Sequence, residues 1–187
     1  GNGKLRNEID EVAWLSPTDA YARLDYARDR EQLLALVAMH SAGELDTWPL
    51  IVVRHASALP RSKRSHKDWL RPLDASGRGR SEALVAVLTA YGPLRAVSSS
   101  STRCRDTLAP YTRAAGLPLK LRESLSEEAF EKDPRRALKT LNRAIELGRP
   151  SALCTHRPLI PALLEALLAR SLDADVAARA GELVSLA

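Results

Sequence analysis

The sequence predicts an α/β domain in which a mostly parallel sheet carries helices on both faces. Two observations predict this fold class. Short apolar stretches of strand length alternate with longer stretches in which apolar residues recur at helical spacing. Polar, turn-forming residues separate the two kinds of stretch. Strands that alternate with helices pair in parallel, because each helix carries the chain back to the start of the next strand.

The first part of the chain has a different pattern. Residues 8–15 are expected to form a short strand with polar flanks, ending at Trp14 and Leu15. A helix is expected to begin at Ser16 and Pro17, because serine caps helices well and proline fits the first helical position. A second helix is expected over about residues 29–40, where leucines and a valine share one face.

A break rich in turn-forming residues follows at residues 41–49, and we place a domain boundary there. One domain is expected at residues 1–45 and a second at 46–187. In the second domain, strands are expected at residues 50–53, 94–97, 117–121 and 152–154. Helices are expected at residues 76–91, 101–115, 133–147 and 158–169, with a polar, basic loop at 55–72.

The composition narrows the class of protein. The net charge of +5 suits anionic partners such as phosphates, but no basic run is interleaved with aromatic residues, so binding to a nucleic-acid polymer is not expected. No stretch approaches the ~20 apolar residues of a membrane span, and the polar first residues do not resemble a signal peptide. Cys104 and Cys154 form no disulfide framework or zinc pattern, which favours a reducing, cytoplasmic location.

Cationic side chains follow three of the expected strands. Arg54 and His55 come directly after the first strand, Arg103 lies near the helix start after the second, and His156 follows the last. The carboxyl ends of parallel strands meet at one edge of a sheet, where α/β folds bind ligands. Backbone N–H groups of the helix that begins near Ser101 would add donors. The pattern therefore predicts a phosphate site among two histidines and at least two arginines.

These segments resemble the motifs of the histidine phosphatase (phosphoglycerate mutase-like) superfamily. The sequence VRHA at residues 53–56 resembles the family's R-H-G signature, and LDASG at 73–77 resembles its L-T-x-x-G helix start. SSSTRCRDT at 99–107 resembles S-P-x-x-R-A-x-Q-T, and THRP at 155–158 resembles S-H-x-P. The four motifs occur in the family's order and at about its spacing. Ala56 replaces the usual glycine, which is tolerable if its backbone φ angle is negative.

The resemblance implies a role for each site residue. His55 would be the nucleophile that forms a phosphohistidine, which water then hydrolyses. Arg54, Arg103 and His156 would bind the phosphoryl oxygens, with Arg71 as a further phosphate-binding candidate. No metal is expected, because arginines replace Mg²⁺ as the positive clamp. A neutral His55 beside a protonated His156 is expected, with pKa values pushed apart by their environments.

A general acid completes the implied site. Glu127 matches the family's L-x-E position best, and Glu123, Glu128 and Glu131 compete with it. The acid is dispensable if the leaving group is a good one, such as a nucleotide phosphate. Most of the basic loop at residues 55–72 is interpreted as solvated surface.

Other phosphatase chemistries fit less well. A cysteine phosphatase needs C-x5-R, but neither Cys104 nor Cys154 is followed by an arginine at that spacing. The D-x-D sequence at residues 173–175 follows a helix, whereas in aspartyl phosphatases it follows the first strand. The glycines of a Walker A phosphate loop are absent.

Residues 8–30 resemble the C-terminal tail of a Nudix hydrolase, in which a strand ending in tryptophan precedes a closing helix. The Nudix box, with its Mg²⁺-binding glutamates, does not occur in this sequence, so Mg²⁺ is expected only for that missing portion. An ordinary strand–helix extension is the alternative interpretation. With a Nudix domain in cis or in trans, the parent would resemble a two-domain MutT-type protein, of a kind associated with hydrolysis of oxidised guanine nucleotides and dinucleoside polyphosphates.

The leading hypothesis is a phosphohydrolase that acts through phosphohistidine on a small phosphorylated substrate, such as 8-oxo-(d)GTP, 8-oxo-(d)GDP or a dinucleoside polyphosphate. A protein phosphohistidine phosphatase is a second enzymatic hypothesis, since the sequence has no large insertion for substrate selection. A phosphate-binding or docking domain without turnover is the third.

Overall fold

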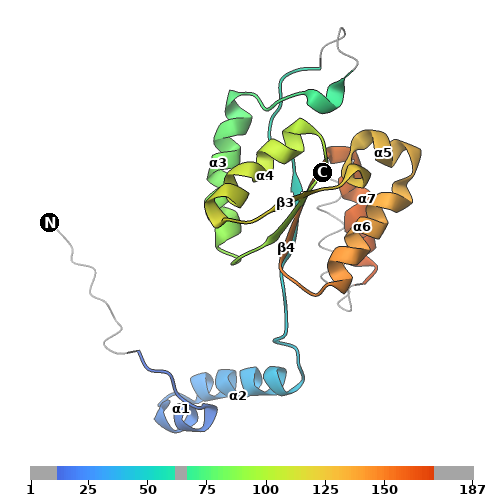
Figure 1. Cartoon of the computed structure of the whole chain (residues 1–187). Coiled ribbons are helices and arrows are strands. Elements are labelled where there is room, and N and C mark those ends of the chain that lie inside the picture. The colour runs from blue at the N-terminus through green and yellow to red at the C-terminus, as the bar shows by residue number, and fades with distance from the viewer. Residues whose placement is uncertain (1–11, 62–66, 171–187) are drawn as a thin grey trace, which may run out of the picture. The chain divides into compact units, whose positions relative to one another are not determined.

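The computed structural model describes residues 12–61 and 67–170 (Figure 1). The chain divides into two compact units, Gly1–Thr47 and Trp48–Ala187. Within the described residues, no helix is both long enough and apolar enough to cross a membrane.

The described part of the N-terminal unit, residues 12–47, contains two helices, α1 (Pro17–Arg23) and α2 (Ala27–Ser41). The Ser16 hydroxyl caps α1 by accepting a hydrogen bond from the backbone N–H of Asp19, as the sequence predicts. Residues 12–15 form no strand, and the rest of the strand expected at 8–15 lies outside the described residues. A strand forms only beside a partner strand that bonds its backbone N–H and C=O groups, so the apolar pattern of these residues is not enough to make them a strand.

A parallel four-stranded sheet forms the centre of the second unit. Its strands are β1 (Leu50–Arg54), β2 (Arg95–Ser98), β3 (Leu119–Leu121) and β4 (Ser151–Thr155). The order across the sheet is β1-β4-β2-β3, and all three pairings are parallel. Each strand lies within two residues of its predicted position, and the predicted α/β class is confirmed.

Helices cover both faces of the sheet (Figure 1). On one face lie α3 (Ala75–Thr89) and α4 (Thr102–Ala115), and on the other α5 (Glu127–Lys132), α6 (Pro134–Glu146) and α7 (Ile160–Leu168). Successive side chains of a strand point to opposite faces, so β4 contributes to both layers. Ala152 and Cys154 pack with the α3–α4 core, whereas Leu153 packs with the α6–α7 core.

Several short elements were not predicted. The six-residue helix α5 begins at an N-cap, Ser126, and ends at Asp133, which caps α6 in turn. Two caps so close together leave no room for a full apolar period, so the helix is hard to recognise in the sequence. Single 3₁₀ turns at Asp68–Leu70, Glu123–Leu125 and Arg157–Leu159 lie in the connections.

Candidate active site

Three strand ends meet at the carboxyl edge of the sheet. The parallel register pairs Arg54 with Thr155 and Ser98 with Cys154, so the residues that follow β1, β4 and β2 emerge side by side. His55 and His156 therefore come together, with their ring centroids 5.2 Å apart. The predicted convergence is thus present in the structure.

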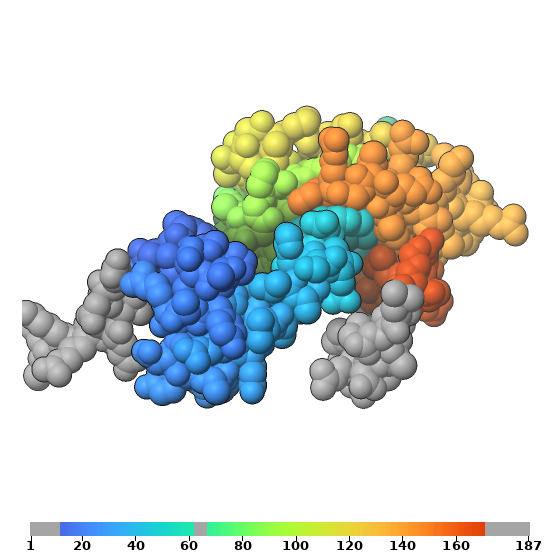
Figure 2. All heavy atoms as spheres, turned by 90° about the horizontal axis from the view of Figure 1, so that it is seen from below, coloured from blue at the N-terminus to red at the C-terminus, as the bar shows by residue number. Residues whose placement is uncertain are grey.

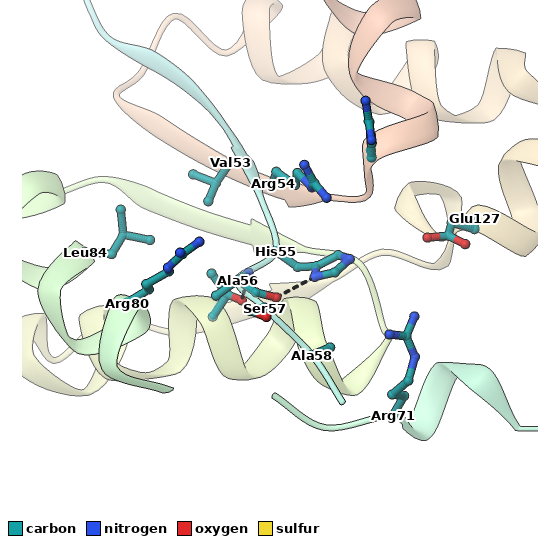
Figure 3. A pocket seen from close by; sticks show the side chains of 12 residues that line it. Val53, Arg54, His55, Ala56, Ser57, Ala58, Arg71, Arg80, Leu84 and Glu127 are labelled. Atoms are coloured by element: carbon teal, nitrogen blue, oxygen red, sulfur yellow. Dashed lines mark hydrogen bonds between the residues drawn. The ribbon is translucent and has the colours of Figure 1, made fainter. Parts of the chain in front are cut away.

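His55 is held in one tautomer by the backbone. Its Nδ1 lies 2.7 Å from the carbonyl oxygen of Ala56, which can only accept a hydrogen bond, so Nδ1 carries the proton (Figure 3). The Nε2 atom then keeps its lone pair. Burial lowers the pKa of His55, and the charges of Arg103 and Arg54 lower it further against the opposing effect of the Ala56 hydrogen bond. The imidazole is therefore neutral at pH 7, as a nucleophile must be.

Arg103 is fully buried and connects the acidic and imidazole groups of the site. Its Nε donates to His55 Nε2 at 3.3 Å, and its Nη2 lies 3.3 Å from Oε1 of Glu127. Its Nη1 donates to the backbone oxygen of Asp68 at 2.9 Å and lies 3.1 Å from the Asp68 carboxylate. A buried guanidinium needs such partners, and together they fix its orientation.

His156 is also fully buried, with both ring nitrogens occupied. Nδ1 lies 3.3 Å from Oε1 of Glu127, and Nε2 lies 3.0 Å from the Ser99 hydroxyl and 3.3 Å from the Cys104 sulfur. Because the carboxylate accepts, Nδ1 carries the proton and Nε2 accepts from the hydroxyl.

The expected protonated state of His156 is wrong. Burial, followed by the charge of Arg103 and that of His55, lowers the pKa of His156 to about 3. The sequence placed the two imidazoles together but did not show how completely this one is buried. A neutral His156 still offers its Nδ1–H to an anion, but it does so as a dipole without a net charge.

Glu127 is the glutamate that the structure brings to this site. It begins α5, lines the cavity beside His55, and contacts Arg103, His156 and Arg61. The competing glutamates at positions 123, 128 and 131 do not line that cavity.

A cavity of about 650 Å³ opens over His55. Its walls are formed by Val53, Arg54, His55, Ala56, Ser57, Ala58, Arg71, Arg80, Leu84, Thr107, Glu127 and Arg157. Four of these residues are arginines and only one is acidic. Figure 3 shows Arg71 and Glu127 on one side of His55 and Arg80 with Leu84 on the other. Arg157 and Arg80, to which the sequence analysis assigns no role, both belong to this wall.

Asp68 is a site residue that the sequence did not reveal. Its carboxylate contacts Arg71 at 2.9 Å, Arg103 at 3.1 Å and Arg61 at 3.6 Å. The hydrogen bond from Arg71 and the charges of the arginines lower its pKa against the opposing effect of burial. The sequence feature that could have indicated Asp68 is its place as an acidic residue in the strongly basic loop, because an isolated acid among several cations commonly pairs with them.

The loop after His55 is fixed by helices α3 and α4. The Ala56 N–H donates to the Thr107 hydroxyl at 3.0 Å, and the Ser57 hydroxyl donates to the Asp74 carboxylate at 2.6 Å. Asp74 also caps α3 by accepting from the Gly77 N–H at 2.7 Å. The φ angle of Ala56 is not positive, so alanine fits where the family motif has glycine. The first residues of α4 do not line the cavity, so the backbone donors expected from that helix start are not among its walls.

Ligand atoms of His55, Glu127 and His156 lie within 4.8 Å of one another, a spacing at which they could share a metal ion. Arg103 contacts both His55 and Glu127 at 3.3 Å, so a positive charge already occupies the same neighbourhood. A second cation would be repelled there, whereas an anion would be attracted. The electrostatics of the site therefore favour a phosphoryl group.

Comparisons with known proteins agree with this geometry. Residues 50–134 match the histidine phosphatase superfamily (branch 1). An 8-oxo-(d)GTP phosphatase of Mycolicibacterium smegmatis is 34% identical over 168 residues, which are 88% of this chain and 50% of that protein. The chain thus spans about half the length of this curated relative.

Solved structures show the same fold at lower identity. A protein named as the phosphohistidine phosphatase SixA of Agrobacterium tumefaciens has a TM-score of 0.52 and 22% identity, over 70% of this chain and 80% of that one. A mycobacterial glucosyl-3-phosphoglycerate phosphatase has a TM-score of 0.53 and 20% identity, over 66% of this chain and 81% of that one. The fold and the strand-end histidines of the second unit thus agree with the match of residues 50–134 to the histidine phosphatase superfamily.

Proposed function

We propose that the domain hydrolyses phosphate esters or anhydrides through a phosphohistidine formed on His55. The observation that carries the proposal is the arrangement of His55 itself. Its Nδ1–H is bonded to the Ala56 carbonyl, and its unprotonated Nε2 accepts a hydrogen bond from Nε of the buried Arg103 at 3.3 Å, a bond that a phosphoryl group at Nε2 would replace. A nucleophile and a positive clamp for an attacked phosphoryl group are thus adjacent.

In the first step, the Nε2 lone pair of His55 forms a bond to phosphorus while the bond from phosphorus to the leaving oxygen breaks. Arg54 and Arg71 line the cavity and Arg103 lies directly behind His55, so these arginines would stabilise the charge on the phosphoryl oxygens. The Nδ1–H of the buried His156 would join them by turning from Glu127 to a phosphoryl oxygen. When that oxygen is strongly basic, Glu127 gives it a proton that the carboxylate has first taken up from solvent. A nucleotide or phosphate leaving group departs as an anion without that proton.

In the second step, water attacks the phosphohistidine. A new bond forms between the water oxygen and phosphorus, the nitrogen–phosphorus bond breaks, and the electron pair returns to Nε2 of His55. Glu127, on the wall beside His55, takes the proton that the water loses. The products are inorganic phosphate and the neutral imidazole that began the cycle. No step requires a metal ion.

Nucleotides, in particular 8-oxo-(d)GTP, 8-oxo-(d)GDP or dinucleoside polyphosphates, are the proposed substrates. Two observations support this choice: the name of the relative that is 34% identical, and the four arginines that line a cavity of about 650 Å³. Such a cavity has more positive charge than one phosphate monoester needs, and it has apolar side chains at Val53 and Leu84.

Residues 1–45 are proposed to be the C-terminal portion of a Nudix domain, whose Mg²⁺-binding box would be supplied in cis or in trans. Helices α1 and α2 bury no residue, and Trp14 is fully exposed. The match to the relative covers more of this chain than the unit from Trp48 to Ala187 provides, so it extends into the N-terminal unit. Exposed apolar surface of this kind is typical of a segment that packs against further protein.

The test is phosphate release from a panel of substrates with EDTA present throughout. The panel contains para-nitrophenyl phosphate, nucleoside mono-, di- and triphosphates with their 8-oxo-guanine forms, and a phosphohistidine peptide. Wild type is compared with His55→Ala and with His40→Ala, a matched control because His40 is an exposed histidine of α2. We expect release that survives EDTA and the control substitution but is lost in His55→Ala.

Each outcome of the panel has a meaning. Preference for nucleotides supports the proposed substrates, and preference for the phosphohistidine peptide would replace them with a protein. Release that requires a metal ion, or that survives in His55→Ala, would disprove the phosphohistidine mechanism. Phosphate binding by a folded protein without any release would indicate a docking domain.

A further inference from the structure

A second hollow, of about 340 Å³, lies on the other side of the unit from helix α3. Its walls are formed by Arg95, Val97, Arg122, Ser124, Arg136, Lys139, Thr140, Arg143, Ala144 and Leu153. These residues belong to β2, β4, the segment after β3 and the length of α6. The hollow shares no residue with the cavity over His55.

Five of the lining side chains are cations and none is acidic. Within the described residues, none of the five takes part in an ion pair. The active site is different, because Arg61, Arg71 and Arg103 each contact Asp68 there. Positive charge in the second hollow is therefore concentrated without internal compensation.

This arrangement costs free energy in the protein alone. Burial lowers the pKa of Arg95, and the charges of Arg122 and Arg143 lower it further, because both guanidinium groups lie close enough to repel that of Arg95. Exposed arginines on a helix normally separate in solvent or pair with an acid. Here Arg95 is half-buried on strand β2 and lines the same hollow as the other four cations, so that it is less free to turn away from them.

The floor and walls give the hollow a defined form. Val97, Ala144 and Leu153 are buried side chains at its base. Ser124 and Thr140 lie at its wall, where their hydroxyl groups are hydrogen-bonded to each other at 2.7 Å and Thr140 donates to the Arg136 carbonyl oxygen at 3.1 Å. Figure 2 shows α6, in orange, at the surface of its unit, where Lys139 and Arg143 are exposed. An anion could thus reach the cations from solvent.

We propose that this basic hollow binds a compact anion with several negative charges, of the polyphosphate class, at a site separate from the catalytic cavity. Cations from β2, from the segment after β3 and from α6 converge on a small volume, which suits a short chain of phosphates. An extended single-stranded nucleic acid is a poorer fit, because none of the lining residues is aromatic and no base could stack there.

The test measures the binding of inorganic tripolyphosphate by titration calorimetry at fixed ionic strength. The pocket variant is Arg122→Ala/Arg143→Ala, in which both side chains are exposed, so that folding is preserved. The control variant is Arg135→Ala/Arg149→Ala, which removes the same charge from exposed positions that do not line the hollow. Turnover of para-nitrophenyl phosphate reports on the catalytic cavity in all three proteins.

In wild type and in the control we expect two binding sites. In the pocket variant, we expect the dissociation constant of one site to rise about tenfold or more, since each lost charge-assisted hydrogen bond costs at least that factor. Turnover of para-nitrophenyl phosphate should be unchanged. Binding that is unchanged in the pocket variant, or equal weakening in both double variants, would overturn the proposal, whereas a single wild-type site that only the pocket variant weakens would count against binding at the catalytic cavity instead. Binding of an acidic peptide or an oligonucleotide in preference to tripolyphosphate would also overturn the proposal.

Discussion

The Nε atom of Arg103 lies 3.3 Å from Nε2 of His55, so a buried positive charge faces the lone pair of the proposed nucleophile. This contact has two consequences. Protonation of His55 is disfavoured, which contributes to its lowered pKa. The space beyond Nε2, where an attacked phosphoryl group would lie, is already positive, so that the charge which builds up in the transition state meets a fixed counter-charge.

Replacement of Arg103 tests this relationship. We expect Arg103→Lys to lower kcat by roughly 10²–10³-fold, the loss typical when one preorganised charge donor is removed. Lysine keeps the positive charge, but its single ammonium group cannot replace the planar guanidinium group, whose three nitrogen atoms contact His55, Glu127 and Asp68 at once. Steady-state kinetics with para-nitrophenyl phosphate would measure the effect.

The control is Arg105→Lys, since Arg105 is two residues away on α4, is exposed and contacts Asp106. It should retain wild-type kcat. An Arg103→Lys enzyme with unchanged kcat would show that the guanidinium group of Arg103 is not needed for the reaction.

Glu127→Gln should separate substrates by their leaving groups. Glutamine has nearly the same shape but cannot donate a carboxylic proton, so hydrolysis of an alkyl phosphate should fall by ~10²-fold or more. Hydrolysis of para-nitrophenyl phosphate should fall much less, because nitrophenolate leaves without a proton. The ratio of kcat/KM for the two substrates is the measurement, and Glu128→Gln is the control. Equal losses on both substrates would indicate that Glu127 acts only by positioning Arg103 and His156.

Acid should destabilise the protein through His156. Its pKa is lowered to about 3 in the folded state, whereas an unfolded histidine titrates near the ordinary value of 6.5. Between these values the unfolded chain binds a proton that the folded protein does not, so the free energy of unfolding falls as the pH falls. This one group contributes a slope of about 1.4 kcal/mol per pH unit in that window.

Urea unfolding between pH 6.5 and pH 5 measures this slope before the carboxylates of Asp68 and Asp74 begin to titrate. His156→Gln should have a shallower dependence than wild type, while His40→Ala should not differ from it. His55, whose pKa is also lowered, contributes in the same direction and remains in both variants. Identical slopes in wild type and His156→Gln would contradict the burial of a neutral imidazole.

Much of the site could be predicted because it depends on strand ends. An apolar run such as residues 50–53 identifies a parallel strand, and topology then places the residues that follow it at a known edge of the sheet. His55 and His156 were located in this way.

Long-range pairing and burial could not be read from the sequence. Asp68 lies 35 residues before Arg103 in the sequence, and nothing local to either residue indicates their contact. The neutral state of His156 likewise depends on surroundings that come from α4, α5 and β2. Helix α5 was not predicted because its six residues, between two caps, are too few to show apolar residues recurring at helical spacing.

Substitution of Gly77 would test how helix α3 supports the loop that follows His55. A Cβ atom at this position would lie 1.9 Å from the backbone oxygen of Ser57, so α3 packs directly on the chain two residues after His55. We expect Gly77→Ala to lower the free energy of unfolding by about 1–3 kcal/mol, the usual cost of overpacking, and to reduce kcat as residues 55–57 shift. Gly79→Ala is a matched control in the same helix, because a Cβ there meets nothing within 4 Å. It should stabilise the protein by about 0.5–1 kcal/mol through helix propensity, without changing kcat. Urea denaturation and turnover measured together would distinguish the two, and an unaltered Gly77→Ala enzyme would mean that α3 does not position His55.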